Sequence, residues 1–469
     1  MTVTALMPVC NLNLVAPLGD LPTARHIADT AAPGLARSGA VSPLIGASLR
    51  RGDVESANTP LAGRSIRTST TATRTTTASR LRPAPGSSAA SSSFTFSQLV
   101  QAYLDCRRHK RSSSSCQAFE AHLERNLCAL FEEIASGQYR PGRSICFVVT
   151  RPKPREVWAA DFRDRVVHHL LYNHIAPRFL ASFVAGSSAC IPGRGTLYAA
   201  RHVEAGMRSI TQNWSRKAFY LKADLSNFFV SIDKHVLWEQ ITVKVHEPFW
   251  QWLAHTILFH DPRENVIVQS GPRLLAQVPP HKSLFSAPAD TGLPIGNLSS
   301  QFFANVHLDA LDQFCKHRLK ARHYTRYVDD FVLLAESTQW LSQALQRIEH
   351  FLGSRLHAQL NPKKTILQPV SRGIDFAGQV ILPWRRITRP RTLRQALHRL
   401  EHMPDADVYA SGNSYLGLAR QASASHHAQA QLCRALLKRG HAVDGMHLTK
   451  AFRKAPTTSR KDTHETPAL

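Results

Sequence analysis

Two adjacent aspartates, Asp329 and Asp330, interrupt an otherwise apolar run at residues 326–334, Arg-Tyr-Val-Asp-Asp-Phe-Val-Leu-Leu. Tyr, Val, Phe and Leu favour a buried β-strand, whereas an ionised carboxylate is costly to bury unless it is paired or binds a metal ion. Neighbouring carboxylates also repel each other, and hard oxygen ligands suit Mg²⁺ or Mn²⁺. The alternative is an ordinary hairpin turn, in which Asp is common. This segment alone leaves both interpretations open.

The charge of the chain indicates a polyanionic partner. Its 469 residues include 58 Lys and Arg but only 33 Asp and Glu, a formal net charge of +25. Nucleic acid is favoured over a membrane, because no apolar run approaches the roughly 18 residues needed to span a bilayer. The eight cysteines show no C-x-x-C pairing, which predicts reduced thiols and a cytoplasmic location. The 24 histidines have no cysteine partners that would indicate a zinc finger.

The two ends of the chain are expected to lack a fold of their own. Residues 1–93 are rich in Ser, Thr, Ala, Pro and Arg and contain no lysine, a composition typical of disordered segments. An organellar transit peptide, a mistaken start codon and a plain solvated tail are alternative explanations. Residues 454–469 are polar and are predicted to be a flexible tail.

Periodicity predicts an alternation of helices and strands between these ends. Two amphipathic helices are expected between 94 and 131, split at 112–115, followed by a strand at 145–149. A rigid, proline-flanked loop would present Lys153 and Arg155 toward a phosphate-bearing ligand. A helix at 162–171 is expected to follow.

The second half of the chain contains the segments that carry chemistry. A strand at 219–224 ends in Asp224, and a Gly/Pro turn at 292–301, capped by Ser, opens a helix that leads to the Asp-Asp hairpin. The turn either brings backbone amides against a nucleotide or is an ordinary join between loop and helix. The further elements expected are a helix at 338–356, a strand pair at 373–382 and helices at 389–400 and 413–437.

The order of these segments resembles a reverse transcriptase from residue 94 to about 437. A basic loop, a strand ending in Asp224, a Gly-Leu-Pro turn, a Tyr-x-Asp-Asp hairpin, a Lys-Thr pair at 364–365 and a Phe-x-Gly strand at 376–378 follow one another as in that family. Ile295 in Gly-Leu-Pro-Ile resembles the retron-type group that includes diversity-generating retroelement enzymes. Segments 187–196 and 376–378 depart from the usual pattern.

The resemblance implies an α+β fold, a right-hand polymerase with fingers, an antiparallel-sheet palm and a helical thumb. The implied boundaries are fingers at 94–215, palm at 216–383 and thumb at 384–453, with a loop-rich insertion at 262–290 inside the palm.

The resemblance also implies the residues of the site. Asp224 and Asp329 would hold two Mg²⁺ ions, or Mn²⁺ as a substitute, with the Leu225 backbone carbonyl as a further ligand and Asp330 as a peripheral carboxylate. The candidates for substrate contacts share polar or bulky side chains near the nucleotide. They are Lys153, Arg155 and Arg163 for the triphosphate, Phe229 as a gate against the ribose 2′-hydroxyl, Ile295 and Gln301 beside the templating base, and Lys364 as proton donor to pyrophosphate, with Lys363 as its alternative.

Three hypotheses about function follow from the resemblance. The first is an RNA-directed DNA polymerase, the error-prone enzyme of a diversity-generating retroelement, which copies an RNA template into cDNA from dNTPs and works with a small basic accessory protein. The second is a retron-like or phage-defence reverse transcriptase. The third is a catalytically silent RNA-binding scaffold.

Overall fold

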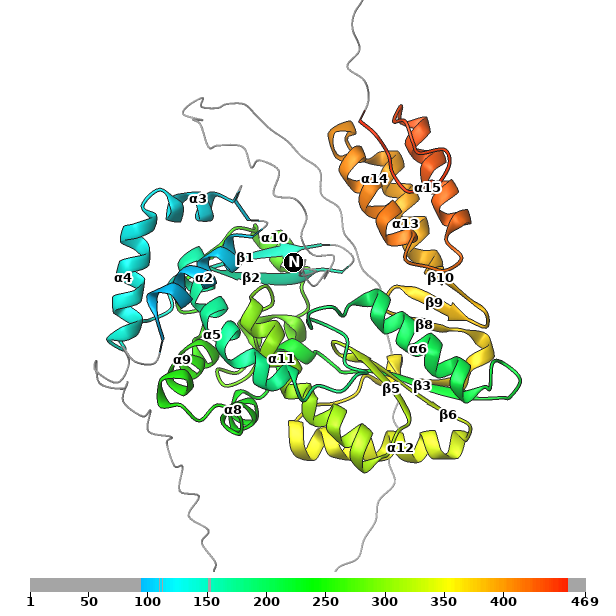
Figure 1. The fold of residues 1–469 in the computed structure, drawn as a ribbon, viewed down its shortest axis with the longest axis horizontal. Helices are drawn as coiled ribbons and strands as arrows, with labels where there is room; N and C mark the ends of the chain where they lie inside the picture. The colour runs from blue at the N-terminus through cyan, green and yellow to red at the C-terminus, as the bar shows by residue number, and fades with distance from the viewer. Residues whose placement is uncertain (1–93, 109, 112, 151–152, 454–469) are drawn as a thin grey trace, which may run out of the picture. The chain divides into compact units, whose positions relative to one another are not determined.

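The structure is a computed structural model that describes residues 94–453 except 109, 112 and 151–152 (Figure 1). The predictions for residues 1–93 and 454–469 lie outside the described residues. Among the described residues, no helix is long and apolar enough to cross a membrane.

The first described region has three helices where two were predicted. They are α2 (Phe96–Arg107), α3 (Ser114–Glu120) and α4 (Leu123–Ala135). Thr95 begins α2 with a capping box to Gln98. The second predicted helix breaks after α3, where the Asn126 side chain donates a 2.9 Å hydrogen bond to the Phe119 carbonyl. The periodicity of the apolar residues continues through this break, which is why the sequence indicated one helix.

A three-stranded sheet follows, with strand order β2-β1-β4. Its strands are β1 (Ser144–Val149), β2 (Arg155–Ala160) and β4 (Val266–Val268). Arg155 is the first residue of β2 and pairs with Val149, so its predicted place in a loop is wrong. The loop-rich 262–290 segment contributes β4, which pairs in parallel with β1. Sequence-distant pairing of this kind leaves no local signal.

A group of helices packs beside this sheet around the largest hydrophobic core. The predicted helix at 162–171 is confirmed and extends to Leu180. The helices and short helical turns here are α5 (Phe162–Leu180), α7 (Phe228–Ser231), α8 (Lys234–Thr242), α9 (Pro248–Phe259), α10 (Pro272–Leu275), η1 (Pro280–Lys282), η2 (Leu284–Ser286), α11 (Leu298–Gln313) and η3 (Phe314–Arg318). Asn297, not a serine, stands at the N-cap of α11.

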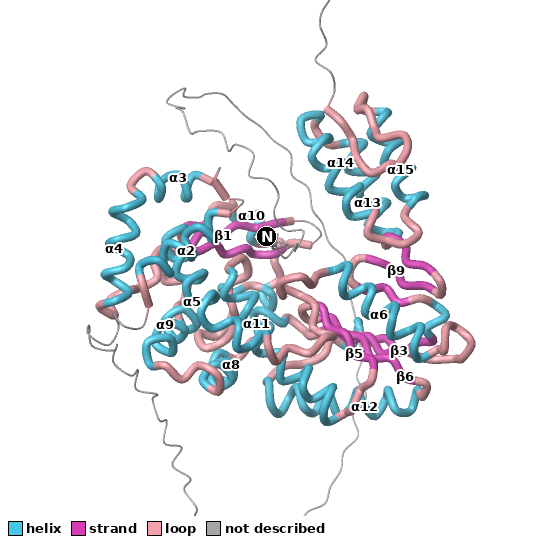
Figure 2. The backbone as a smooth tube through the Cα atoms, viewed as in Figure 1, coloured by secondary structure: helices cyan, strands magenta, loops and turns pink. Residues whose placement is uncertain are grey.

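The second sheet has four antiparallel strands in the order β5-β6-β3-β7. They are β3 (Phe219–Asp224), β5 (His323–Tyr327), β6 (Asp330–Ala335) and β7 (Ile366–Pro369), and the predicted strand at 219–224 is confirmed at both ends. Helix α6 (Thr196–Ile210) covers one face, and α12 (Thr338–Phe351) with η4 (Leu352–Leu356) covers the other (Figures 1 and 2).

Side chains alternate between the two faces of this sheet, as a pleated strand requires. Tyr220 and Val332 pack in the core under α6. Leu221 and Phe331 pack in the largest core. The charged residues at the ends of β3 and β6 follow the same alternation.

The last described region combines a small sheet with three helices. Its elements are η5 (Pro362–Lys364), η6 (Val370–Arg372), β8 (Ile374–Phe376), β9 (Gln379–Leu382), β10 (Arg385–Thr388), α13 (Pro390–His402), α14 (Asp405–Ala419) and α15 (His426–Lys438). The predicted strand pair is confirmed, β10 was missed, and the predicted helix at 413–437 is interrupted between α14 and α15. Helices α13–α15 share their own hydrophobic core.

Candidate active site

The antiparallel pairing of β3 and β6 places Asp224 directly opposite Asp330. Both side chains point to the same face of the sheet as Tyr220 and Val332. Helix α6 covers this face farther along the strands. Asp329 lies in the two-residue turn between β5 and β6 with Val328, whose φ is 57°. Positive φ is uncommon for a β-branched residue. The fold therefore brings Asp224 to Asp329 and Asp330, which lie more than a hundred residues later in the chain.

Burial and mutual repulsion make the Asp329 and Asp330 carboxylates hard to ionise. Burial, with the Asp224 and Asp330 carboxylates beside it, raises the pKa of Asp329 to about 7. Burial also raises the pKa of Asp330 to about 6, although Lys222 acts in the opposite direction. Asp224 is 4% exposed. A cation bound at this corner of the sheet would therefore be stabilised by the carboxylates.

Two lysines already approach the carboxylates. The Lys364 ammonium donates a 2.6 Å hydrogen bond to Oδ1 of Asp224. Lys222 Nζ lies 3.9 Å from Oδ2 of Asp330 and donates to the Asp375 carbonyl. Lys222 was not predicted as part of the site, although its place two residues before Asp224 in a strand puts it on the same face.

The carboxylates fit a hard divalent cation by their chemistry. Their oxygens are the ligands that Mg²⁺ prefers, and the raised pKa values of Asp329 and Asp330 mean that a nearby positive charge would stabilise their ionised forms. Among the described residues, no group of three or more His, Cys, Asp and Glu side chains is already gathered as a metal site. One carboxylate oxygen of Asp224 instead accepts a hydrogen bond from Lys364.

Phe229 follows Asp224 by five residues, and the chain turns sharply between them. Asn227 has a φ of 48° and precedes the short helix α7, which carries Phe229. The Phe229 carbonyl accepts a 2.7 Å hydrogen bond from the Leu293 amide, and the Gly292 amide donates to the Ile232 carbonyl. The Gly-Leu-Pro turn is therefore bonded to the segment that follows Asp224.

The other end of the same turn is bonded to β2. The Ile295 carbonyl accepts from the Trp158 amide at 2.7 Å, and Asn297 Oδ1 accepts from the Ala160 amide. Gly296 has a φ of 134°, and a Cβ there would lie 2.6 Å from the Trp158 carbonyl oxygen. The close approach that requires glycine at position 296 is thus to β2. Ile295 is half-buried.

The three predicted triphosphate contacts have different surroundings. Lys153 and Arg155 are exposed, just before and at the start of β2. Arg163, on α5, pairs with Glu133 and lies over the Tyr139 ring at 5.3 Å. The structure thus gives Arg163 a role in joining α4 to α5.

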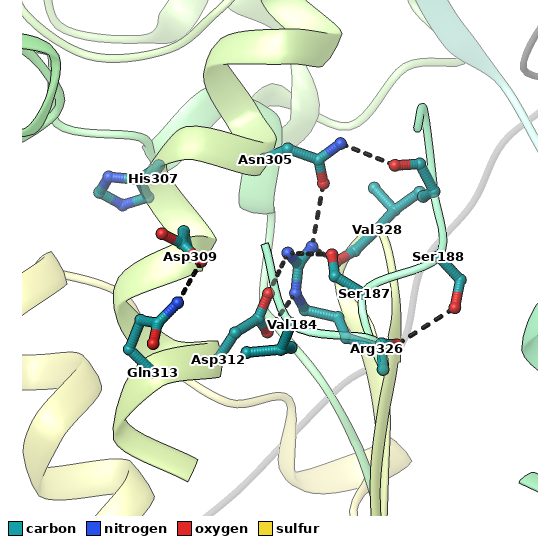
Figure 3. Close-up of polar contacts among 12 residues, drawn as sticks. Val184, Ser187, Ser188, Asn305, His307, Asp309, Asp312, Gln313, Arg326 and Val328 are labelled. Carbon is teal, nitrogen blue, oxygen red and sulfur yellow. Dashed lines mark hydrogen bonds and ion pairs between the residues drawn. The ribbon is translucent and has the colours of Figure 1, made fainter. Parts of the chain in front are cut away.

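Gln301 lies on α11, half-buried, where its Oε1 accepts a 3.6 Å hydrogen bond from Cys190 Sγ. Leu225 is buried, and its amide donates to the Asp329 carbonyl at 3.3 Å. Lys363 stands beside Lys364 in η5 and is exposed. Arg326, which opens the apolar run, was not predicted to have a role, but it lies at the centre of a buried polar network (Figure 3).

Comparison with known proteins gives two findings. Residues 151–381 match the family model of reverse transcriptase (RNA-dependent DNA polymerase). The chain is also similar to Protein YkfC of Escherichia coli (strain K12), with 23% identity over 297 residues that cover 56% of this chain and 73% of that protein. The segment matched by the family model contains the three carboxylates, Phe229 and Lys364.

Proposed function

We propose, because residues 151–381 of the chain form a domain of the reverse transcriptase family, that this protein is an RNA-directed DNA polymerase that uses the Asp224, Asp329 and Asp330 corner as its catalytic centre. The observation that carries the assignment is the register of β3 against β6, which sets Asp224 opposite Asp330 and beside Asp329. The partners are then an RNA template, dNTPs and the cDNA product.

The fold supports a division into fingers, palm and thumb. The β5-β6-β3-β7 sheet with α12 would be the palm, because it carries the carboxylates. The three helices α13–α15, with a core of their own, would be the thumb at 384–453. The β2-β1-β4 sheet and the helices around it would be the fingers. In this assignment the 262–290 segment leaves the palm and adds β4 to the fingers sheet.

Asp224 and Asp329, with the Leu225 carbonyl, are the groups that would hold Mg²⁺, and Asp330 is the more peripheral carboxylate. When bound, the ions would promote attack by the primer 3′-hydroxyl and stabilise charge on the leaving pyrophosphate. The protein's own part is to orient these oxygens: the Leu225 amide bonds the Asp329 carbonyl, and the sheet register aligns Asp224 with Asp330.

The remaining site residues divide the work of substrate binding. Lys153 and Arg155 would bind the triphosphate, because both cations are exposed at the start of β2. Phe229 would exclude a ribose 2′-hydroxyl by collision. Lys364 would give up a proton to pyrophosphate, and its hydrogen bond to Asp224 holds its ammonium beside the carboxylates.

Primer extension on an RNA template tests the proposal directly. The wild type should extend a DNA primer with dNTPs and Mg²⁺, and Asp329→Asn should abolish extension. Asp290→Asn is the matched control, since Asp290 has a 68% exposed side chain in the insertion and should leave extension unchanged. RNA binding without any extension by the wild type would instead identify a silent scaffold. Full activity in Asp329→Asn would remove the metal assignment.

Error-prone synthesis of the diversity-generating kind is the finer form of the proposal. Ile295 supports it, because its side chain offers packing but no hydrogen bond near the expected templating base, while its carbonyl is already engaged by β2. Sequencing of cDNA made in vitro should show frequent errors at template adenines. Ordinary fidelity at those positions would favour the retron-like or defence role.

A further inference from the structure

Arg326 is a fully buried cation in the apolar run that forms β5 and β6. It is 0% exposed and pairs with Phe331 across the hairpin, so its side chain enters the largest core rather than the carboxylate face. A buried guanidinium is costly unless its donors are satisfied. Its partners therefore show what the cation does.

All five N–H donors of Arg326 have partners (Figure 3). Nε and Nη2 donate to the two carboxylate oxygens of Asp312 on α11, at 2.7 and 2.6 Å. Nη2 also donates to Ser187 Oγ at 2.9 Å, and Nη1 donates to Asn305 Oδ1 at 3.2 Å. The fifth bond runs from Nη1 to the Val328 carbonyl at 2.9 Å. A planar fork of this kind cannot be replaced by the single ammonium of lysine.

The partners of Arg326 tie three segments together. Asn305, on α11, donates through Nδ2 to the Ala189 carbonyl. The backbone of Arg326 bonds the same loop, because its amide donates to the Gly186 carbonyl and its carbonyl accepts from the Ser188 amide. Helix α11, the loop around residues 186–189 and the β5-β6 hairpin thus form one hydrogen-bonded block.

The bond to Val328 reaches the catalytic turn. Val328 has a φ of 57°, a strained conformation that persists where surrounding structure enforces it. The next residue is Asp329, whose carbonyl accepts the Leu225 amide. The Arg326 guanidinium therefore sets the backbone of the turn from inside the core, while the Asp329 carboxylate faces the site.

We propose that Arg326 is a positioning residue for Asp329: clamped by Asp312, Asn305 and Ser187, it fixes the Val328 carbonyl and thereby the carboxylate of the turn. The proposal rests on the function proposed above, and it deepens it by naming the group that holds the catalytic turn. Arg326 contacts no substrate in this role, because its side chain lies on the opposite face of the hairpin.

The test compares Arg326→Lys with the double variant Arg326→Met/Asp312→Asn. The double variant removes both buried charges, so neither is left unpaired, while an amide oxygen remains for the Tyr324 hydroxyl that now bonds Asp312. The control is Arg178→Met/Glu247→Gln, which removes another two-point arginine–carboxylate pair outside the candidate site.

Two readouts separate positioning from mere stability. In folded Arg326 variants, kcat should fall about 10- to 100-fold, because small misplacements of a catalytic group are costly, while KM for dNTP changes little. Hydrogen–deuterium exchange of the peptide containing the Leu225 amide should accelerate in the same variants. The control should leave both quantities at the wild-type level. A folded double variant with wild-type kcat and wild-type exchange would overturn the proposal.

Further outcomes are also informative. If neither Arg326 variant folds, Ser187→Ala removes one of the five bonds only, and it should still accelerate exchange at Leu225; unchanged exchange and unchanged kcat in that variant would count against the clamp. If the wild type does not extend primers, the proposed function fails, whereas exchange at Leu225 still decides whether Arg326 holds the turn.

Discussion

The ammonium of Lys364, in η5, lies 2.6 Å from Oδ1 of Asp224. It therefore bonds an oxygen that would also be a ligand of a metal ion. The same side chain helps to lower the pKa of Asp329 against the effect of burial. A proposed proton donor and a proposed metal ligand are therefore directly linked.

Lys364→Met should have two separable effects. Loss of a proton donor should lower kcat by about 10²- to 10⁴-fold, and removal of the competing ammonium should let Mg²⁺ reach half-saturation at a lower concentration. Steady-state kinetics across a Mg²⁺ titration measures both. Lys363→Met is the matched control, since it removes the neighbouring ammonium of the same short helix. A larger loss in Lys363→Met would transfer the role to that residue.

Phe229→Ala should open the site to ribonucleotides. Without the ring, a 2′-hydroxyl meets no obstacle, so discrimination between dNTP and rNTP should fall by about 10- to 100-fold. Competing incorporation of the two nucleotides on one template gives the ratio. Phe285→Ala, at a 40% exposed position in the insertion, should not change it. Equal use of both nucleotides by the wild type would count against the gate.

Lys153→Ala and Arg155→Ala should each raise KM for dNTP by about tenfold, the value of one charge-assisted hydrogen bond. Arg163→Ala should behave differently, because Arg163 pairs with Glu133: stability should fall by about 1 kcal/mol or less, with KM unchanged. Kinetics and urea unfolding on the three variants distinguish the two patterns. A raised KM in folded Arg163→Ala would restore it as a triphosphate contact.

Stability should fall as pH drops below about 6.5, in part because of His168. Burial lowers its pKa from 6.5 to about 3, so between these values the unfolded chain binds a proton that the folded protein excludes, and unfolding is favoured. Above pH 6.5 the contribution is constant. Comparison with His168→Gln isolates this residue from Asp329 and Asp330, whose raised pKa values act in the opposite sense. Urea midpoints at several pH values should show a shallower decline in the variant; parallel curves would contradict the assignment.

Affinity for RNA should weaken steeply with salt. The formal charge of +25 predicts many phosphate contacts, each of which releases counterions on binding. Fluorescence titration with a labelled RNA at rising KCl gives the slope. A complex insensitive to salt would mean that the basic residues do not contact phosphate.

Local pattern was sufficient to predict the elements that hold the carboxylates. The alternation of Tyr220 and Leu221 across the sheet has the period of a strand, and β3 begins and ends where that pattern does. The β5-β6 hairpin could be predicted for the same reason. Periodicity says nothing about partners, however, so it could not show that β4 pairs with β1 or that Lys364 bonds Asp224.

The buried polar groups show the same limit. Arg326 in an apolar run was a visible anomaly, but the four residues that accept its side-chain hydrogen bonds lie up to 139 positions away in the chain. Asn297, and not the predicted serine, stands at the N-cap of α11, and its side chain accepts a long-range hydrogen bond from the Ala160 amide. Such residues are recognised in sequence as exceptions, and only the fold explains them.

The turn around Gly296 has a consequence for how nucleotide and template would be sensed. The Trp158 amide bonds the Ile295 carbonyl, the Ala160 amide bonds the Asn297 side chain, and the absence of a Cβ at position 296 lets β2 lie close to this turn. The strand that carries Arg155 and the turn that carries Ile295 are consequently hydrogen-bonded to each other. If the enzyme closes over an incoming nucleotide, Arg155, expected to bind its phosphates, and Ile295, expected to lie beside its base pair, would move together. A mispaired base would then disturb both contacts.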